Sequence, residues 1–160
     1  MRSNLNTLQQ HISALCMFLA LMFVPKLAQA ADYYLVGDFN KWTPGDTYKF
    51  NVSGNSATLS LTGAQINAAS IEFLIKAVPS SGNPWYLKNS SATTVTVGGD
   101  AVVASSANNN CQNCDYTVSG LSTSASTTYT FTLTANKSDI NDSKLTITSN
   151  TTGGGHLYYS

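Results

Sequence analysis

The sequence predicts an all-β protein in which two antiparallel sheets pack face to face. Many short segments alternate apolar and polar residues with a period of two, as half-buried strands do. Clusters of turn-forming residues separate these segments, such as "SGNS", "SSGNP", "GGD" and "NKSDINDS". Residues 31–160 are enough for one domain with a sizeable core and too few for two comfortable ones.

The first thirty residues predict a cleavable signal peptide. Arg2 is the only charge before an apolar stretch over 12–24, and "AQA" at 28–30 gives the small-x-small pattern that precedes a cleavage site. The stretch is shorter than the ~20 residues that cross a bilayer and no later apolar run is long enough, so no membrane insertion of the mature chain is expected. A lipoprotein interpretation through Cys16 is the alternative. We expect a secreted protein that is extracellular, periplasmic or associated with an outer membrane.

Strand signals run through the mature chain from residue 33 to residue 148. Candidate strands in chain order are 33–36, 48–52, 57–61, 71–76, 85–88, 94–97, 101–104, 116–118, 128–134 and 144–148. The clearest is "TYTFTLTA", which has Tyr129, Phe131 and Leu133 on one face and threonines on the other. Only "TGAQINAAS", 62–70, could form a turn or two of helix. From these ten segments we expect an immunoglobulin-like antiparallel sandwich of about eight to nine strands over 31–150, followed by a glycine-rich tail over 151–160.

The charge of the mature chain excludes some partners. Six lysines stand against eight acids, which gives a net charge of −2, whereas nucleic acid and anionic membranes require a concentrated basic face. Serine and threonine contribute 18 residues each over 31–160. Such a surface meets water and ligands through hydroxyl and amide groups.

Cys111 and Cys114 in "NNNCQNCDY" are the cysteines that remain after cleavage. A disulfide that closes a small loop is the prediction, because export oxidises thiols. A redox-active pair, free thiols and a metal site are the alternatives. Metal is the weakest of these, since His156 is the sole mature histidine and no second cysteine pair exists.

Two segments resemble a known family. "YLVGDFNKW" is similar to the first strand and turn of starch- and glycogen-binding β-sandwiches, and "IEFLIKAVPSSGNPWYLKN" resembles their strand, loop and tryptophan segment. The family includes the glycogen-binding domain of the AMP-activated kinase β subunit and the domain preceding the barrel in isoamylases and branching enzymes. The likeness is greatest to the outer-membrane starch-binding proteins of bacterial starch-utilisation systems. It covers most of 33–89, and the loop with the two cysteines departs from the family.

The resemblance implies a noncatalytic domain that binds α-glucan polysaccharides or oligosaccharides without a cofactor. Trp42 and Trp85 would form a platform for glucose rings, and Lys76 would hydrogen-bond sugar hydroxyls. Asn89 is a candidate for a later family asparagine, as is the run 108–110. Other surface proteins of a starch-utilisation system are candidate partners.

The residues by themselves leave alternatives open. An aromatic face suits the apolar C–H face of a sugar, but Trp42 could equally fold over the end of the sandwich. Trp85 and Tyr86 must point to opposite faces of a strand, and we expect Trp85 outside. Lys76 is equally well explained as a solvated lysine, and Asn89 is better explained as a turn residue.

Nothing in the sequence predicts an enzyme. Asp38 and Asp46 flank Trp42 as turn formers, "DINDSK" lacks the glycine of a calcium loop, and no catalytic or phosphate-binding motif is present. The main alternative function is a structural or adhesive surface module that binds no sugar. A small hydrolase or inhibitor whose site the sequence does not reveal is the second alternative.

Overall fold

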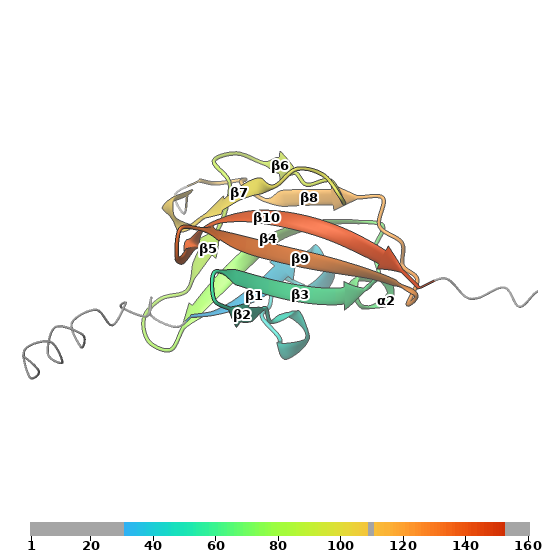
Figure 1. Ribbon diagram of the computed structural model, residues 1–160, viewed down its shortest axis with the longest axis horizontal. Coiled ribbons are helices and arrows are strands. Elements are labelled where there is room, and N and C mark those ends of the chain that lie inside the picture. The colour runs from blue at the N-terminus through green and yellow to red at the C-terminus, as the bar shows by residue number, and fades with distance from the viewer. Residues whose placement is uncertain (1–30, 109–110, 153–160) are drawn as a thin grey trace, which may run out of the picture. The chain divides into compact units, whose positions relative to one another are not determined.

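The computed structural model describes residues 31–108 and 111–152. These residues form an all-β sandwich-like arrangement of two five-stranded sheets, as the alternation predicts (Figure 1). The sheet with β3, β9 and β10 faces the viewer in Figure 1, and the sheet with β1 and β4 lies behind it. The predicted signal peptide and His156 lie outside the described residues.

The first sheet, here sheet A, is built on a long central strand. Its strands are β1 (Ala31–Gly37), β4 (Ser70–Pro79), β5 (Trp85–Leu87), β6 (Thr93–Thr94) and β8 (Tyr116–Ser119). The order is β1-β4-β8-β6, and β5 pairs with β4 beyond the end of β8. All pairs are antiparallel except β6 with β8. Strand β4 therefore carries neighbours along both of its sides.

The second sheet, sheet B, contains the threonine-rich strands. Its strands are β2 (Asn51–Ser53), β3 (Ser56–Thr62), β7 (Val102–Ser105), β9 (Thr127–Asn136) and β10 (Asp139–Thr151), in the order β2-β3-β9-β10-β7. Tyr129, Phe131 and Leu133 face the core, as predicted, while the intervening threonines do not. The strand β10 has an irregular register between Asp139 and Ser143.

The predicted helical turn is present as α2 (Gly63–Ile66). A capping box begins it, because the Gln65 backbone N–H donates to Thr62 Oγ1 and the Thr62 backbone N–H donates to Gln65 Oε1. The described residues also form three short 3-10 helices: η1 (Asp38–Asn40), η2 (Asp46–Tyr48) and η3 (Ser106–Asn108). The expected strand over 48–52 is thus shorter, because η2 occupies its first residue and β2 begins only at Asn51.

The core lies between the sheets, and backbone bonds close its sides. The Phe73 ring contacts Tyr116 in a tilted arrangement and Phe131 edge to face, with ring centroids 5.4 and 5.7 Å away. On one side the Phe50 N–H donates to the Tyr33 carbonyl (2.8 Å). On the other side, Lys88 and Ser105 form an isolated antiparallel bridge that joins the end of β5 to β7. These bonds fix how sheet A sits against sheet B where the candidate site lies.

Candidate functional site

Trp42 occupies an unusual turn. Lys41 and Trp42 both have positive φ, 56° and 59°, and the Thr43 N–H donates to the Asn40 carbonyl at 3.2 Å. Positive φ at both central residues defines a type I′ turn, which normally has asparagine or glycine there. The Trp42 side chain is nonetheless 39% exposed. Neither full burial nor an easy backbone conformation explains a tryptophan at this position.

Hydrogen bonds hold this turn against the end of β1. The Gly37 N–H donates to Asn40 Oδ1 (2.8 Å), and Asn40 Nδ2 donates to the Leu35 carbonyl (2.9 Å). The Trp42 N–H donates to the Gly37 carbonyl at 2.8 Å. The asparagine of "GDFNKW" is therefore a structural residue, which fixes the backbone that presents the indole.

Trp85 faces the interior, contrary to the expected orientation. Trp85 pairs with Ala77 of the neighbouring strand β4 and lies on the same face of β5 as Leu87. Its side chain packs against the core. Its Nε1–H donates to Asn141 Oδ1 at 2.8 Å. Tyr86 takes the outer face instead. Leu87 decides this, because it is fully buried opposite Ile75 and so sets which face each neighbour occupies.

The two tryptophans lie at different positions along the strand direction of sheet A. Trp42 follows the Gly37 end of β1, and Gly37 lies opposite Phe73 in β4. Trp85 lies opposite Ala77, four residues further along β4, which corresponds to about 13 Å of strand. Strand pairing does not bring the two indoles onto one platform.

A different set of residues meets on the outer face of sheet A. Lys49 is bridged to Tyr34, Tyr34 pairs with Lys76, and Lys76 pairs with Tyr86. We call these four side chains the lysine–tyrosine row. Lys76 Nζ lies 5.8 Å from the Tyr86 ring centroid, and Nζ of Lys88, two residues along β5, lies 5.6 Å from it. Two ammonium groups, one from the row and one from Lys88, therefore lie within 6 Å of the same aromatic ring centroid.

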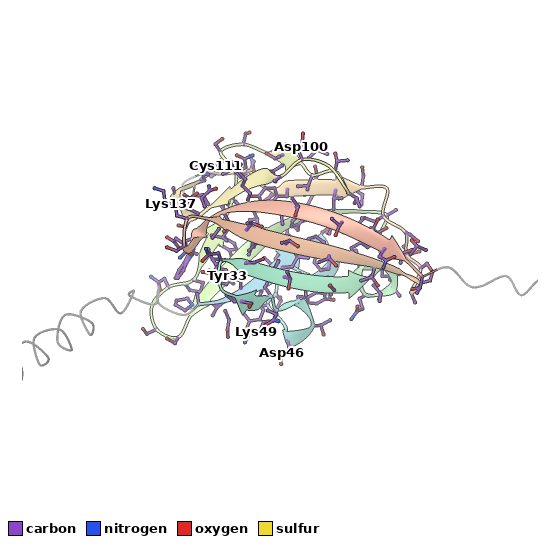
Figure 2. The ribbon with its side chains drawn as sticks, in the orientation of Figure 1. Tyr33, Asp46, Lys49, Asp100, Cys111 and Lys137 are labelled. Carbon is purple, nitrogen blue, oxygen red and sulfur yellow. A yellow bond between two sulfur atoms is a disulfide. The ribbon has the colours of Figure 1, made fainter. Side chains whose placement is uncertain are left out.

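The charges of this face are unevenly neutralised. Lys49 Nζ lies 2.9 Å from Asp32 Oδ2, and this hydrogen bond raises the pKa of the lysine. It is the one ion pair among residues 31–108 and 111–152. Lys76 and Lys88 thus have no carboxylate partner in that part of the chain. Lys88 instead donates to the Cys111 carbonyl at 2.9 Å. Figure 2 labels Lys49 and Cys111, which lie near opposite edges of the domain.

The remaining candidate residues have structural partners. Asn89 Nδ2 donates to Thr93 Oγ1 (2.9 Å), and Asn89 Oδ1 accepts the Ser90 N–H (2.7 Å), which is the turn role expected for it. Asn108 Nδ2 donates to the Lys88 carbonyl (3.2 Å), and residues 109 and 110 lie outside the described part. A disulfide joins Cys111 to Cys114.

The sequence predicts Lys76 as a site residue but gives no such signal for the other three members of the row or for Lys88. The letters "WYLK" contain the alternation that separates Trp85 from Tyr86, but three of the four residues are apolar or aromatic. Because Leu87 is buried opposite Ile75, Tyr86 and Lys88 are the residues on the outer face. This assignment depends on the register of β4 with β5.

Comparison of the chain with protein-family models, with curated proteins and with solved structures finds no match. The resemblance to starch- and glycogen-binding modules therefore rests on the two quoted segments. Within the described residues, no helix is long and apolar enough to span a membrane. No three His, Cys, Asp or Glu side chains gather into a potential metal site in that same part of the chain.

Proposed function

We propose that this chain is a noncatalytic carbohydrate-binding domain that takes α-glucan on the outer face of sheet A. The observation that carries the proposal is Tyr86 on the outer face, with the ammonium groups of Lys76 and Lys88 within 6 Å of its ring centroid. Tyr34, on the far side of Lys76, extends this face to a second aromatic residue. The immunoglobulin-like topology, the export of the protein and its starch-utilisation partners are part of the same proposal.

The chemistry of a sugar suits such a face. A pyranose ring presents an apolar C–H surface with hydroxyl groups around its rim, so an aromatic ring covers the surface while ammonium groups donate to the rim. At about 25 cal/mol per Å² of buried apolar area, a stacked ring contributes on the order of 1 to 2 kcal/mol. One or two such contacts with several hydrogen bonds correspond to micromolar to millimolar affinity, at about 1.4 kcal/mol per decade. Binding of a polymer would gain further from repeated contacts.

Trp42 supports the proposal independently. A residue that adopts left-handed backbone costs on the order of 1 to 3 kcal/mol, and such residues concentrate at functional sites. Trp42 combines this backbone with an exposed indole. Tyr86 takes over the role that the resemblance implies for Trp85, because Tyr86 is the member of that pair on the face of Lys76.

Affinity electrophoresis of residues 31–160 through gels with and without amylopectin tests the proposal. We expect amylopectin to retard the wild-type domain, and Tyr86→Ala to weaken binding by about 5- to 30-fold, the factor that corresponds to 1 to 2 kcal/mol. Lys76→Ala should weaken it by about 3- to 10-fold through loss of a hydrogen bond worth about 1 kcal/mol. Trp42→Ala should also reduce the retardation.

Lys144→Ala provides the matched control. Lys144 is an exposed lysine on β10, paired with Thr134 in sheet B, so its removal changes net charge equally without touching the row. We expect it to be retarded like the wild type. Absence of any retardation, or equal retardation of wild type and Tyr86→Ala, would reject this site and favour the structural or adhesive alternative.

A further inference from the structure

We propose that the Cys111–Cys114 disulfide loop positions Lys88 over Tyr86, so that an intact disulfide is needed for full ligand binding. The ligand side of this inference rests on the proposed function. The positioning itself does not, because it concerns contacts within the domain. It gives a role to the C-x-x-C motif, which the binding site leaves unexplained.

The main chain of Lys88 is held by sheet B. Its N–H donates to the Ser105 carbonyl (3.2 Å), its carbonyl accepts the Ser105 N–H (2.9 Å), and that carbonyl also accepts Asn108 Nδ2 (3.2 Å). The strand sets the direction of the Lys88 side chain. Because Leu87 is buried, its neighbour Lys88 projects from the outer face of sheet A. The backbone thus determines where the side chain starts.

The loop determines where the side chain ends. Lys88 Nζ donates to the Cys111 carbonyl at 2.9 Å while it lies 5.6 Å from the Tyr86 ring centroid. A lysine side chain has many rotamers in water, so a fixed acceptor is required to hold its ammonium group at one place. The Cys111 carbonyl is the acceptor that the described structure provides.

The disulfide connects this acceptor to the core. Cys114 is 1% exposed and lies two residues before Tyr116, the first residue of β8, whereas Cys111 is partly exposed. The Cys111 N–H donates to the Asn108 carbonyl (3.1 Å), so a backbone bond holds one side of Cys111 and the disulfide holds the other. Without the sulfur–sulfur bond, Cys111 is joined to the buried Cys114 only through the main chain of the two residues between them, so its carbonyl is a less fixed acceptor for Lys88.

Lys76 is the natural comparison. Its ammonium group lies at 5.8 Å from the same ring, but Lys76 belongs to β4, which pairs with both β1 and β5 at this level. The disulfide loop has a hydrogen bond with Lys88, and none with Lys76 is found among the described residues. Reduction should therefore change the position of the Lys88 ammonium group and leave that of Lys76 unchanged.

A double-mutant comparison tests the inference. A water-soluble phosphine reduces the disulfide to two thiols and is itself oxidised, and amylopectin affinity is measured before and after. In the wild type we expect reduction to weaken binding by about 3- to 10-fold, as Lys88→Ala does, the factor that corresponds to loss of one ordinary hydrogen bond. In Lys88→Ala reduction should cause no further loss, whereas Lys76→Ala should remain sensitive. An equal response of Lys88→Ala and wild type, or no response of the wild type, would overturn the proposal.

A second readout does not depend on any sugar. The NMR signals of the Tyr86 ring should shift on reduction in the wild type and should not shift in Lys88→Ala. The Cys111→Ser/Cys114→Ser variant should show the shifted Tyr86 signals without reductant, while the amide signals of β9 report that the fold is intact. Unmoved Tyr86 signals in the reduced wild type and in this variant would refute the positioning role. If they move but amylopectin never binds, the positioning stands and the proposed function fails.

Discussion

At the scale of single residues, one asparagine holds the inward tryptophan. Asn141 Oδ1 accepts the Trp85 Nε1–H at 2.8 Å and the Tyr33 hydroxyl at 3.2 Å. Asn141 Nδ2 and its backbone N–H both bond to Asp139 Oδ1. A side chain of β10 in sheet B thereby joins β5 and β1 of sheet A. Trp85 is a structural residue by this geometry, whereas Trp42 is an exposed one.

Replacing Trp85 by phenylalanine distinguishes these two roles. Trp85→Phe keeps most of the apolar contact but removes the Nε1–H bond, so the free energy of unfolding should fall by about 1 kcal/mol or somewhat more. Urea unfolding measures this loss, and binding of amylopectin should be unchanged. A variant with normal stability and lost binding would return Trp85 to the ligand site.

At the scale of elements, the passage from β1 into η1 depends on a missing side chain. Gly37 has an extended backbone, φ −172°, which any residue can adopt. The restriction is space, since a Cβ at Gly37 would collide with the Glu72 carbonyl oxygen and the Phe39 ring. The edge-to-face contact of Phe39 with Tyr48, at 5.3 Å between centroids, packs the two ends of this loop together. Gly37 therefore allows the close approach of β1, β4 and η1.

Gly37→Ala should disturb this junction. A rotamer change cannot relieve the collision with a backbone atom. We therefore expect the free energy of unfolding to fall by about 1 to 3 kcal/mol. Binding should weaken as well, because the Trp42 N–H bonds to the Gly37 carbonyl.

Gly45→Ala is the matched control within the same loop. Its φ is −158°, and the nearest atom to an added Cβ is Tyr48 Cδ2 at 3.7 Å, an ordinary van der Waals distance. Chemical denaturation of both variants should show a near-normal midpoint for Gly45→Ala. Equal midpoints for the two would contradict the steric explanation.

At the scale of the whole molecule, buried phenol groups make the sandwich sensitive to alkali. Burial raises the pKa of Tyr116 well above its usual value of 10.0, and its hydroxyl donates to the Val103 carbonyl across the two sheets at 2.6 Å. Burial, together with the Asp139 charge, also raises the pKa of Tyr33, which the Asn141 hydrogen bond partly opposes. In both cases folding favours the neutral phenol.

The sign of the pH dependence follows from these directions. Below about pH 10 both tyrosines are neutral in the folded and unfolded states, so their full contribution to stability is present. Above it the unfolded chain ionises while the folded phenols resist, and the stability is lost as pH rises through the folded pKa values. We expect the urea midpoint to fall steeply above about pH 10.

Tyr116→Phe checks the assignment of this effect. Near neutral pH it should cost about 1 kcal/mol through loss of the bond to Val103. Its midpoint should fall less steeply than that of the wild type above about pH 10, because one ionisable phenol is gone. Identical alkaline slopes for the two proteins would show that Tyr116 does not contribute to the alkaline loss.

The sequence by itself determined the class of the fold and most of its strands. Alternation such as that of "TYTFTLTA" is a local property, since successive side chains of any strand point to opposite faces. The capping box of α2 and the turn role of Asn89 are local for the same reason. Each of these requires only residues that are neighbours in the chain.

Only the tertiary structure decided the candidate site. The lysine–tyrosine row joins residues 34, 49, 76 and 86, which meet through the register of β1, β4 and β5. That register follows from burying Leu87 opposite Ile75, and a shift of one residue would exchange Tyr86 for Trp85 on the outer face. The positive φ of Trp42 is likewise held by the bonds from the Trp42 N–H to the Gly37 carbonyl and from the Thr43 N–H to the Asn40 carbonyl. Local alternation identifies two faces, but long-range packing decides which of them meets the solvent.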